Sequence, residues 1–479
     1  MKAPLSKDRR SWRLLVCLAL ATIVQPSARG DDGALQKGVA GLVAGFQKKT
    51  PAAAVGVSIV DLKSGAVLAD VRANELFIPA SNQKLLTSAF ALARHGGDDH
   101  FTTTVYAAGK DLVVVGDFDP TLGDPRLAEE AGKSIYEEMD RWAAAIRQHV
   151  GPRFEGDIVI CTEGKAGAYR NSDWPVKQFG DWYAAPAAEV NFNNNCFDVT
   201  FTITGGTIVP SVSPASRLIQ VVNNVKSGKK QTWGAVSNED DSVLILKGTL
   251  VKPSNDPVYV ACNNPPMLFG RTLAERIMRA GVEFGGKVRP AEKKSLDLSK
   301  ATVIAQTTTP LATAMARANK RSLNMVAECI FLHAGDGTWP GSAALMTKTL
   351  TETFGLPDKS LVVQDGSGLS RSNLVSPAAM TTLLSGMLKR ADAGVLLASL
   401  PIGGTDGTMQ RRLDEGAYKG RVLAKTGYIT GVSCLSGYVL GADKKPVVAF
   451  SVMANKVPGA AGAKDLENRI CQLVVDSLK

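Results

Sequence analysis

The sequence predicts an α+β protein in which an antiparallel sheet flanked by helices is interrupted by a β-rich insertion. Three observations lead to this fold class. Apolar residues alternate around a short turn near each end of the chain, at residues 54–74 and 432–456, which predicts two β-hairpins. Helical apolar spacing lies outside both hairpins. Between them, short β-rich runs are separated by turns rich in Gly, Pro and Asn.

Length and composition indicate a globular protein of more than one domain. A chain of 479 residues is too long for one compact core, so we expect two or three domains. Residues 1–29 carry six Lys or Arg and one Asp, which is half of the net charge of +10. The charge left after their removal is ordinary for this size, so no nucleic-acid partner is predicted.

Residues 1–29 have the pattern of a secretory signal peptide. A basic start precedes the apolar run at 14–24, which is short for a membrane span, and small residues follow near Ala28. We therefore expect an exported protein, in the periplasm or cell envelope. An uncleaved membrane anchor is the alternative.

The remaining elements follow in order. A helix with apolar spacing is expected from Gly33 to Lys49, then the first hairpin, then a helix that begins near Ile78. We place the β-rich insertion at 97–270, and the outer domain at 30–96 and 271–479. A helix from about Ala463 to Leu478 closes the chain, so that one sheet is assembled from both ends of the sequence.

The segment "IPASNQKLLTSAFAL" contains a lysine in an otherwise apolar helix. Ser81 and Lys84 are spaced i, i+3 and therefore share one helical face. Burial of Lys84 lowers its pKa and favours the neutral amine, which can activate the Ser81 hydroxyl as a nucleophile. A second Ser-x-x-Lys, Ser227 to Lys230, lies in a charged turn without a buried helix behind it. A helix N-cap with a surface lysine is the alternative interpretation of Ser81.

Two further motifs strengthen the chemical interpretation. Ser322 and Asn324, in "RSLNMVAECIF", open another apolar helix, where a serine can relay a proton and an asparagine can hold a substrate amide. Lys425, Thr426 and Gly427 lie at the C-terminal sheet, where a lysine and a hydroxyl can hold a carboxylate. Gly427 would let a substrate backbone lie close to the strand. The three motifs occur together, in this order, in penicillin-binding proteins and β-lactamases.

The chain resembles the D-Ala-D-Ala carboxypeptidase/endopeptidase family, the class C low-molecular-mass penicillin-binding proteins. The resemblance covers nearly all of the mature chain and includes "VGDFDPTL", "AAEVNFNNN" and "VVQDGSGLSRSNLVSP". It implies a penicillin-binding, serine β-lactamase-like domain with a large insertion after the nucleophile helix. It also implies hydrolysis of peptidoglycan stem peptides through an acyl-serine intermediate, with β-lactam antibiotics as covalent inhibitors and no cofactor or metal.

The resemblance assigns a role to each motif residue. Ser81 would attack the D-Ala carbonyl, Lys84 would accept its proton, and Ser322 would relay a proton towards the leaving amine. Asn324 would orient the acyl side chain. Lys425 and Thr426, with Gly427 beside them, would bind the terminal carboxylate. A homodimer is compatible with the sequence but not specified by it.

Some positions depart from the family pattern or stay ambiguous. Tyr428 follows the Lys-Thr-Gly motif where the family often has a small hydroxyl residue, and Leu323 replaces a commonly polar residue. The inserted domain of such enzymes can read a diamino-acid amine with an acidic residue; Asp181 is one guess, with a turn or cap role as the alternative. Asp365 is expected in a loop that borders the cleft rather than in a direct catalytic role.

Several different functions would share parts of this pattern. A β-lactamase would need a means of rapid deacylation, for which no dedicated carboxylate is evident. A serine esterase or aminopeptidase could use the same fold, and a cell-wall-binding scaffold could keep it without turnover. The six cysteines beyond residue 29 form no metal-binding motif and lie in apolar segments typical of buried thiols. The four histidines share no spacing that indicates a metal site.

Overall fold

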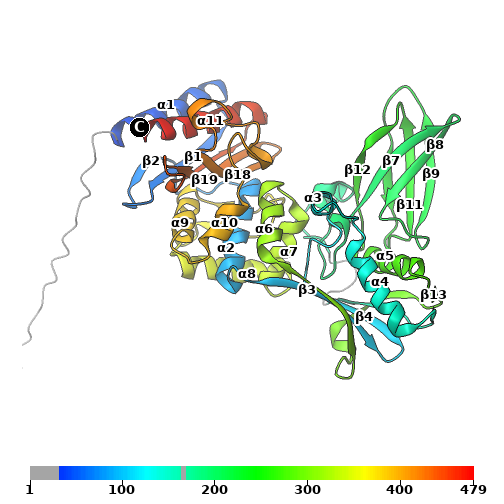
Figure 1. The fold of residues 1–479 in the computed structure, drawn as a ribbon. Helices are drawn as coiled ribbons and strands as arrows, with labels where there is room; N and C mark the ends of the chain where they lie inside the picture. Colours follow the sequence, from blue (N-terminus) through cyan, green and yellow to red (C-terminus); the bar gives the residue numbers. More distant parts are fainter. Residues whose placement is uncertain (1–31, 163–168, 479) are drawn as a thin grey trace, which may run out of the picture.

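The computed structural model describes residues 32–162 and 169–478, so the predicted signal peptide lies outside the described residues. A five-stranded antiparallel sheet combines both ends of the chain, and the α+β prediction is confirmed (Figure 1). In spatial order its strands are β18 (Val422–Ile429), β19 (Val432–Leu440), β20 (Pro446–Asn455), β1 (Ala54–Asp61) and β2 (Val67–Val71).

Both faces of this sheet are covered, and the alternation along β19 shows how. Leu435 and Val439 pack with α1 (Asp32–Lys49) and α11 (Ala460–Ser477), which lie side by side on one face (Figure 1). Cys434 and Tyr438 have the opposite parity and pack with helices on the other face. A central strand that is apolar on both sides therefore joins two separate cores.

The helices on that second face form a helical lobe. Helix α7 is apolar around most of its circumference and is buried almost throughout, as such a pattern requires. Helix α8 begins where Thr338 Oγ1 accepts the Gly341 N–H and ends at the left-handed Gly355. The helices are α2 (Gln83–His95), α6 (Leu311–Lys320), α7 (Asn324–Ala334), α8 (Trp339–Phe354), α9 (Pro377–Met387) and α10 (Ala393–Ser399).

The insertion contains a mixed sheet that packs against two helices. Helices α4 (Glu137–Val150) and α5 (Pro265–Arg279) supply Trp142 and Phe269 to its core. The chain enters through β3 and leaves through β15, which pair with each other. In spatial order the strands are β14 (Val288–Glu292), β6 (Ile158–Thr162), β4 (Asp111–Gly116), β3 (His100–Ala108) and β15 (Thr302–Pro310). Strand β5 (Arg153–Phe154) pairs beside them with β13 (Glu283–Phe284).

A second, strand-rich part of the insertion has its own core around Phe197 and Leu246. It consists of two three-stranded sheets, seen in green at the right of Figure 1. One contains β12 (Ser254–Ala261), β7 (Cys196–Thr204) and β8 (Thr207–Ser213), and the other β10 (Gly234–Ser237), β11 (Val243–Leu250) and β9 (Gln220–Ser227).

The strand pairing places the end of the insertion later than the sequence analysis did. The expected boundary at 270/271 falls inside α5, whose two halves share one core with the inserted strands. β14 and β15 then pair with β6 and β3. These long-range pairings make residues up to about 310 part of the insertion, so the helical lobe resumes at Leu311.

A buried ion pair holds the insertion against the helical lobe. Asp124 caps the short helix α3 (Pro125–Glu130), and both of its carboxylate oxygens accept hydrogen bonds from the Arg317 guanidinium on α6. Asp124 is 1% exposed and Arg317 8%. Because removal of either partner leaves a buried charge unpaired, loss of this contact should be strongly destabilising.

Candidate active site

Ser81 lies in a short 3-10 turn, η1 (Ala80–Asn82), that leads directly into α2. Lys84 stands one turn further on, with its Nζ 3.1 Å from Ser81 Oγ. The lysine is 0% exposed, whereas Ser81 is partly accessible. The i, i+3 spacing thus brings the two side chains together on a buried helix.

Two further oxygens surround Lys84. Its Nζ donates to Asn324 Oδ1 at 2.7 Å and to the Ser367 carbonyl at 2.8 Å. The Asn324 amide is oriented by its Nδ2, which donates to the Tyr183 carbonyl at 2.7 Å. A neutral amine has two N–H groups and one lone pair. Since the two carbonyl-type oxygens accept the N–H groups, the lone pair is left for the Ser81 hydroxyl.

Burial decides the charge of this amine. Desolvation lowers the pKa of Lys84 to about 7, although the negative charges of Asp365 and Glu328 oppose the shift. An amine with this pKa is substantially neutral near neutral pH, which suits a group that must accept a proton.

A second Ser/Lys pair lies opposite the first. Lys425 Nζ on β18 donates to Ser322 Oγ at 3.0 Å and to the Thr426 carbonyl at 2.8 Å. Burial, followed by the charge of Lys84, lowers the pKa of Lys425 well below its ordinary value. Ser322 occupies the turn between α6 and α7 with φ 59°, a left-handed conformation that is uncommon for a residue with a side chain.

The structure explains the glycine at position 427 differently from the sequence analysis. A Cβ atom at this position would lie 2.7 Å from the Pro79 carbonyl oxygen and 3.2 Å from the Asn82 N atom. The space beside the glycine is therefore taken by the Ser81 turn rather than left for a substrate backbone. Gly427 allows β18 to pack directly against the turn that carries the candidate nucleophile.

Thr426 and Tyr428 lie on either side of this glycine. Thr426 is partly exposed, and its Oγ1 donates to Thr408 Oγ1 at 2.8 Å. Tyr428 is 51% exposed, and its ring lies 5.8 Å from Lys464 Nζ on α11. The Tyr428 side chain therefore contacts the terminal helix on the face of the sheet opposite Lys425.

Asp365 organises the loop that reaches Lys84. Its buried carboxylate accepts the N–H groups of Gly368 and Ser370, the Trp174 indole N–H and the Asn373 amide. These bonds use both oxygens, so Asp365 shapes the loop that places the Ser367 carbonyl at the amine. This agrees with the expected loop role.

Sequence reasoning missed Glu328, a fully buried acid on α7. Its carboxyl accepts the backbone N–H groups of Ser367 and Gly366 and the Trp339 indole N–H. Burial and the charge of Asp365 raise the pKa of Glu328 to about 8. An acid inside the apolar run "NMVAECIF" is the same kind of signal that drew attention to Lys84, and it could have found this residue.

The structure brings Ser81, Lys84 and Asn324 into one hydrogen-bonded cluster, and Ser322 with Lys425 into another. The second Ser-x-x-Lys is elsewhere: Ser227 ends β9 in the insertion and, like Lys230, is exposed. Asp181 is also exposed, and its carboxylate accepts the Tyr183 hydroxyl at 2.7 Å.

A cavity of about 720 Å³ adjoins Asn324 on the side of the insertion. Asp198 lines it, and burial raises the pKa of this carboxyl to about 7. The side-chain oxygens of Asn193 and Asn194 are buried there without a hydrogen-bond partner in the described structure. Trp182 and Tyr259 also line the cavity, and so do three arginines, Arg126, Arg317 and Arg321. Oxygen acceptors, aromatic residues and guanidinium groups thus line one cavity.

Fold and sequence comparisons together define a serine-type peptidase. The family model described as D-Ala-D-Ala carboxypeptidase 3 (S13) matches residues 39–476. The chain therefore belongs to the S13 family of D-Ala-D-Ala carboxypeptidases, as the resemblance of its motifs implied.

Relatives and solved structures agree with this family. The chain is 26% identical over 427 residues to the D-alanyl-D-alanine carboxypeptidase DacB of Haemophilus influenzae, covering 84% of this chain and 85% of the relative. It is 28% identical over 435 residues to the D-alanyl-D-alanine carboxypeptidase of Actinomadura sp., covering 85% and 78%. The crystal structure of penicillin binding protein 4 from H. influenzae has the same fold, with TM-score 0.75, 23% identity and coverage of 90% and 99%.

Two findings concern the rest of the chain. All six cysteines beyond residue 29 are buried, so the expectation of buried thiols is confirmed. Among residues 32–162 and 169–478, we find no helix that is long and apolar enough to cross a membrane.

Proposed function

We propose that Ser81 is the nucleophile of this peptidase and that Lys84 is its general base. The observation that carries the proposal is the pair of oxygens, from Asn324 and Ser367, that bind the amine and leave its lone pair for Ser81. Ser81 Oγ bonds to the carbonyl carbon of the D-Ala–D-Ala peptide bond while its proton moves to Lys84 Nζ. The N–H groups of Ser81 and of a β18 residue stabilise the oxyanion.

The second Ser/Lys pair serves the leaving group in this proposal. As the C–N bond breaks, Ser322 passes a proton to the nitrogen of the departing D-Ala, and the proton that Lys84 accepted from Ser81 replaces it on Ser322. An acyl-serine remains, and Lys84 is neutral again. Lys425 and Thr426 bind the terminal carboxylate, and Asn324 orients the amide of the acyl side chain. Water then hydrolyses the ester and regenerates Ser81. The substrates are peptidoglycan stem peptides, and β-lactams acylate the same serine.

Intact-mass analysis with a penicillin tests the nucleophile. We expect one covalent adduct on the wild-type chain and on the matched control Ser227→Ala, and none on Ser81→Ala. Release of D-Ala from a stem peptide should follow the same pattern. If folded wild-type protein forms no adduct, an esterase or a scaffold without turnover replaces this assignment, whereas rapid loss of the adduct would favour a β-lactamase.

We further propose that the cavity beside Asn324 receives an ammonium group of the stem peptide. Asn193 Oδ1, Asn194 Oδ1 and the Asp198 carboxylate are acceptors that such a group can satisfy, and nearby aromatic faces favour a cation. Asp198 is preferred over Asp181 for this role, because Asp198 lines the cavity, whereas Asp181 is exposed and does not line it.

Stem peptides with a free or an acetylated side-chain amine test this subsite. Wild-type protein should hydrolyse the free-amine peptide with the higher kcat/KM. Asp198→Asn should lose this preference, and Asp181→Asn, the matched control, should keep it. Equal rates on both peptides with the wild-type protein would contradict the ammonium subsite without affecting the roles of Ser81 and Lys84.

We also propose that residues 1–29 direct export and are removed. The mature N-terminus of protein recovered from the periplasmic fraction tests this, since cleavage should fall near Ala28. A homodimer stays a prediction, which the molar mass measured by light scattering would test.

A further inference from the structure

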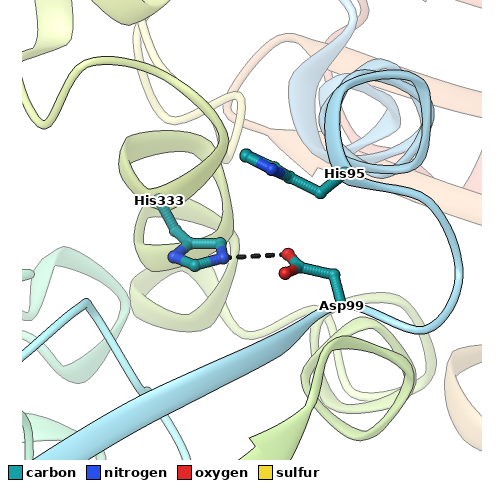
Figure 2. Close-up of side chains that lie close together, drawn as sticks. All are labelled: His95, Asp99 and His333. Atoms are coloured by element: carbon teal, nitrogen blue, oxygen red, sulfur yellow. Dashed lines mark hydrogen bonds and ion pairs between the residues drawn. The ribbon is translucent and has the colours of Figure 1, made fainter.

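Three side chains with metal-binding atoms meet far from Ser81. His95 is the last residue of α2, Asp99 directly precedes β3, and His333 lies near the end of α7 (Figure 2). Their ligand atoms all lie within 4.8 Å of one another. His95 is exposed, and the other two are partly buried, so the cluster is accessible from solvent on one side.

Both ring nitrogens of His333 face an oxygen atom. His333 Nδ1 lies 3.0 Å from the Asp117 carbonyl oxygen, and Nε2 lies 2.9 Å from Asp99 Oδ2. Nε2 is therefore the ring nitrogen beside the Asp99 carboxylate, and these two atoms are placed to bind one cation together.

His95 supplies a further donor atom at the same point. Its ring centroid lies 5.3 Å from that of His333. Two imidazoles and a carboxylate form a common donor set for zinc.

We propose that His95, Asp99 and His333 bind a zinc ion. In this site His333 Nδ1 donates a hydrogen bond to the Asp117 carbonyl oxygen. A contact of this kind typically orients a metal-binding histidine. The Phe101 ring, whose centroid lies 4.4 Å from that of His333, holds the imidazole from one side. The exposed side of His95 leaves room for water as a fourth ligand.

The position of this site in the fold indicates a positioning role. Helices α2 and α7 are linked near their N-terminal ends by the hydrogen bond from Lys84 to Asn324. The zinc ion links the same two helices at their opposite ends. From Lys84 to His95 the helix axis rises about 16 Å, so the ion takes no part in the peptidase chemistry. It instead fixes the spacing of the two helices that carry the catalytic cluster.

The site also lies where the chain crosses between the helical lobe and the insertion. Asp99 directly precedes β3, by which the chain enters the insertion, and the Asp99 carbonyl accepts the N–H of Leu311, where the chain returns. Asp117, which holds His333, follows β4 of the insertion. A zinc ion here therefore fastens both parts of the molecule at one point.

Binding of the metal alone tests the proposal. We would use the full mature chain without a polyhistidine tag, stripped with a chelator, and titrate it with zinc chloride by calorimetry. One zinc ion should bind per chain and raise the melting temperature. Cobalt chloride should give a visible absorption band from a site with nitrogen and oxygen ligands.

Variants separate this site from adventitious binding. His95→Ala and Asp99→Asn should weaken zinc binding at least roughly tenfold and abolish the melting-temperature increase. The exposed His149 on α4 provides the matched control His149→Ala, which should bind as wild type. His95 is itself exposed, so its variant should fold even if His333→Ala does not.

A protonated His333 paired with Asp99 is the competing explanation. In that case zinc would neither bind to one site nor raise the melting temperature. Either result would overturn the zinc proposal. Because none of these readouts depends on turnover, their failure would leave the assignment of Ser81 and Lys84 intact.

Discussion

Acylation of Ser81 should follow the ionisation of Lys84. Burial lowers the pKa of this amine from 10.5 to about 7. With an ordinary pKa, about one lysine in three thousand would be neutral at pH 7, whereas with the lowered value about half are. The second-order rate constant for acylation by a penicillin should therefore reach a plateau above about pH 8 and be roughly a hundredfold lower at pH 5.

Stopped-flow measurements between pH 5 and 10 test this profile, with circular dichroism at each pH as a control for folding. A rate constant that is flat from pH 5 to 8, or one that keeps rising to pH 10, would refute Lys84 as the proton acceptor.

The pH dependence of folding stability gives a second test of the lowered Lys84 pKa. Between about pH 7 and 10.5 the unfolded chain binds the Lys84 proton and the folded chain does not, so wild-type stability should rise with pH relative to Lys84→Met, by up to roughly 5 kcal/mol.

Three further predictions use other contacts. Gly427→Ala should slow acylation at least roughly tenfold with little loss of secondary structure, because its Cβ would push on the Ser81 turn; an unchanged penicillin rate would contradict this. Arg317→Leu should lower the unfolding free energy in urea by about 3–5 kcal/mol, because Asp124 stays buried without its partner; a loss below about 1 kcal/mol would mean that water reaches the carboxylate. The six buried thiols beyond residue 29 should be unreactive to a thiol reagent until urea unfolds the protein, and early reaction of any of them would show local opening.

Local sequence patterns were sufficient to predict several helices and strands of the outer domain. The first hairpin, the helix after Ile78 and the closing helix each depend on apolar spacing within about twenty residues, and all three are present in the structure. The contact between Ser81 and Lys84 follows from the helical repeat itself. These features are encoded over short stretches of sequence, which is why they could be predicted.

Contacts between distant segments were the part that sequence patterns could not supply. Helix α5 has an ordinary amphipathic pattern, so nothing local indicated that it packs on inserted strands. The role of Gly427 depends on the Pro79 carbonyl, which reaches it only after β18 has joined the sheet. His95 and His333 lie on different helices, and no spacing rule connects them. In each case, residues that are distant in the sequence become neighbours only in the folded structure.

The sheet built from both ends of the chain has a consequence for biosynthesis. Strand β1 pairs along its whole length with β20, which is synthesised only after the insertion and the helical lobe. Until then β1 has β2 as its neighbour, and a lone hairpin is marginally stable in water. The sheet of the outer domain therefore stays incomplete until β20 has been synthesised, while the insertion, with its own cores, can fold earlier. A chain that lacks β20 cannot complete the sheet that holds β18 against the Ser81 turn, so activity should appear only after this strand has been added.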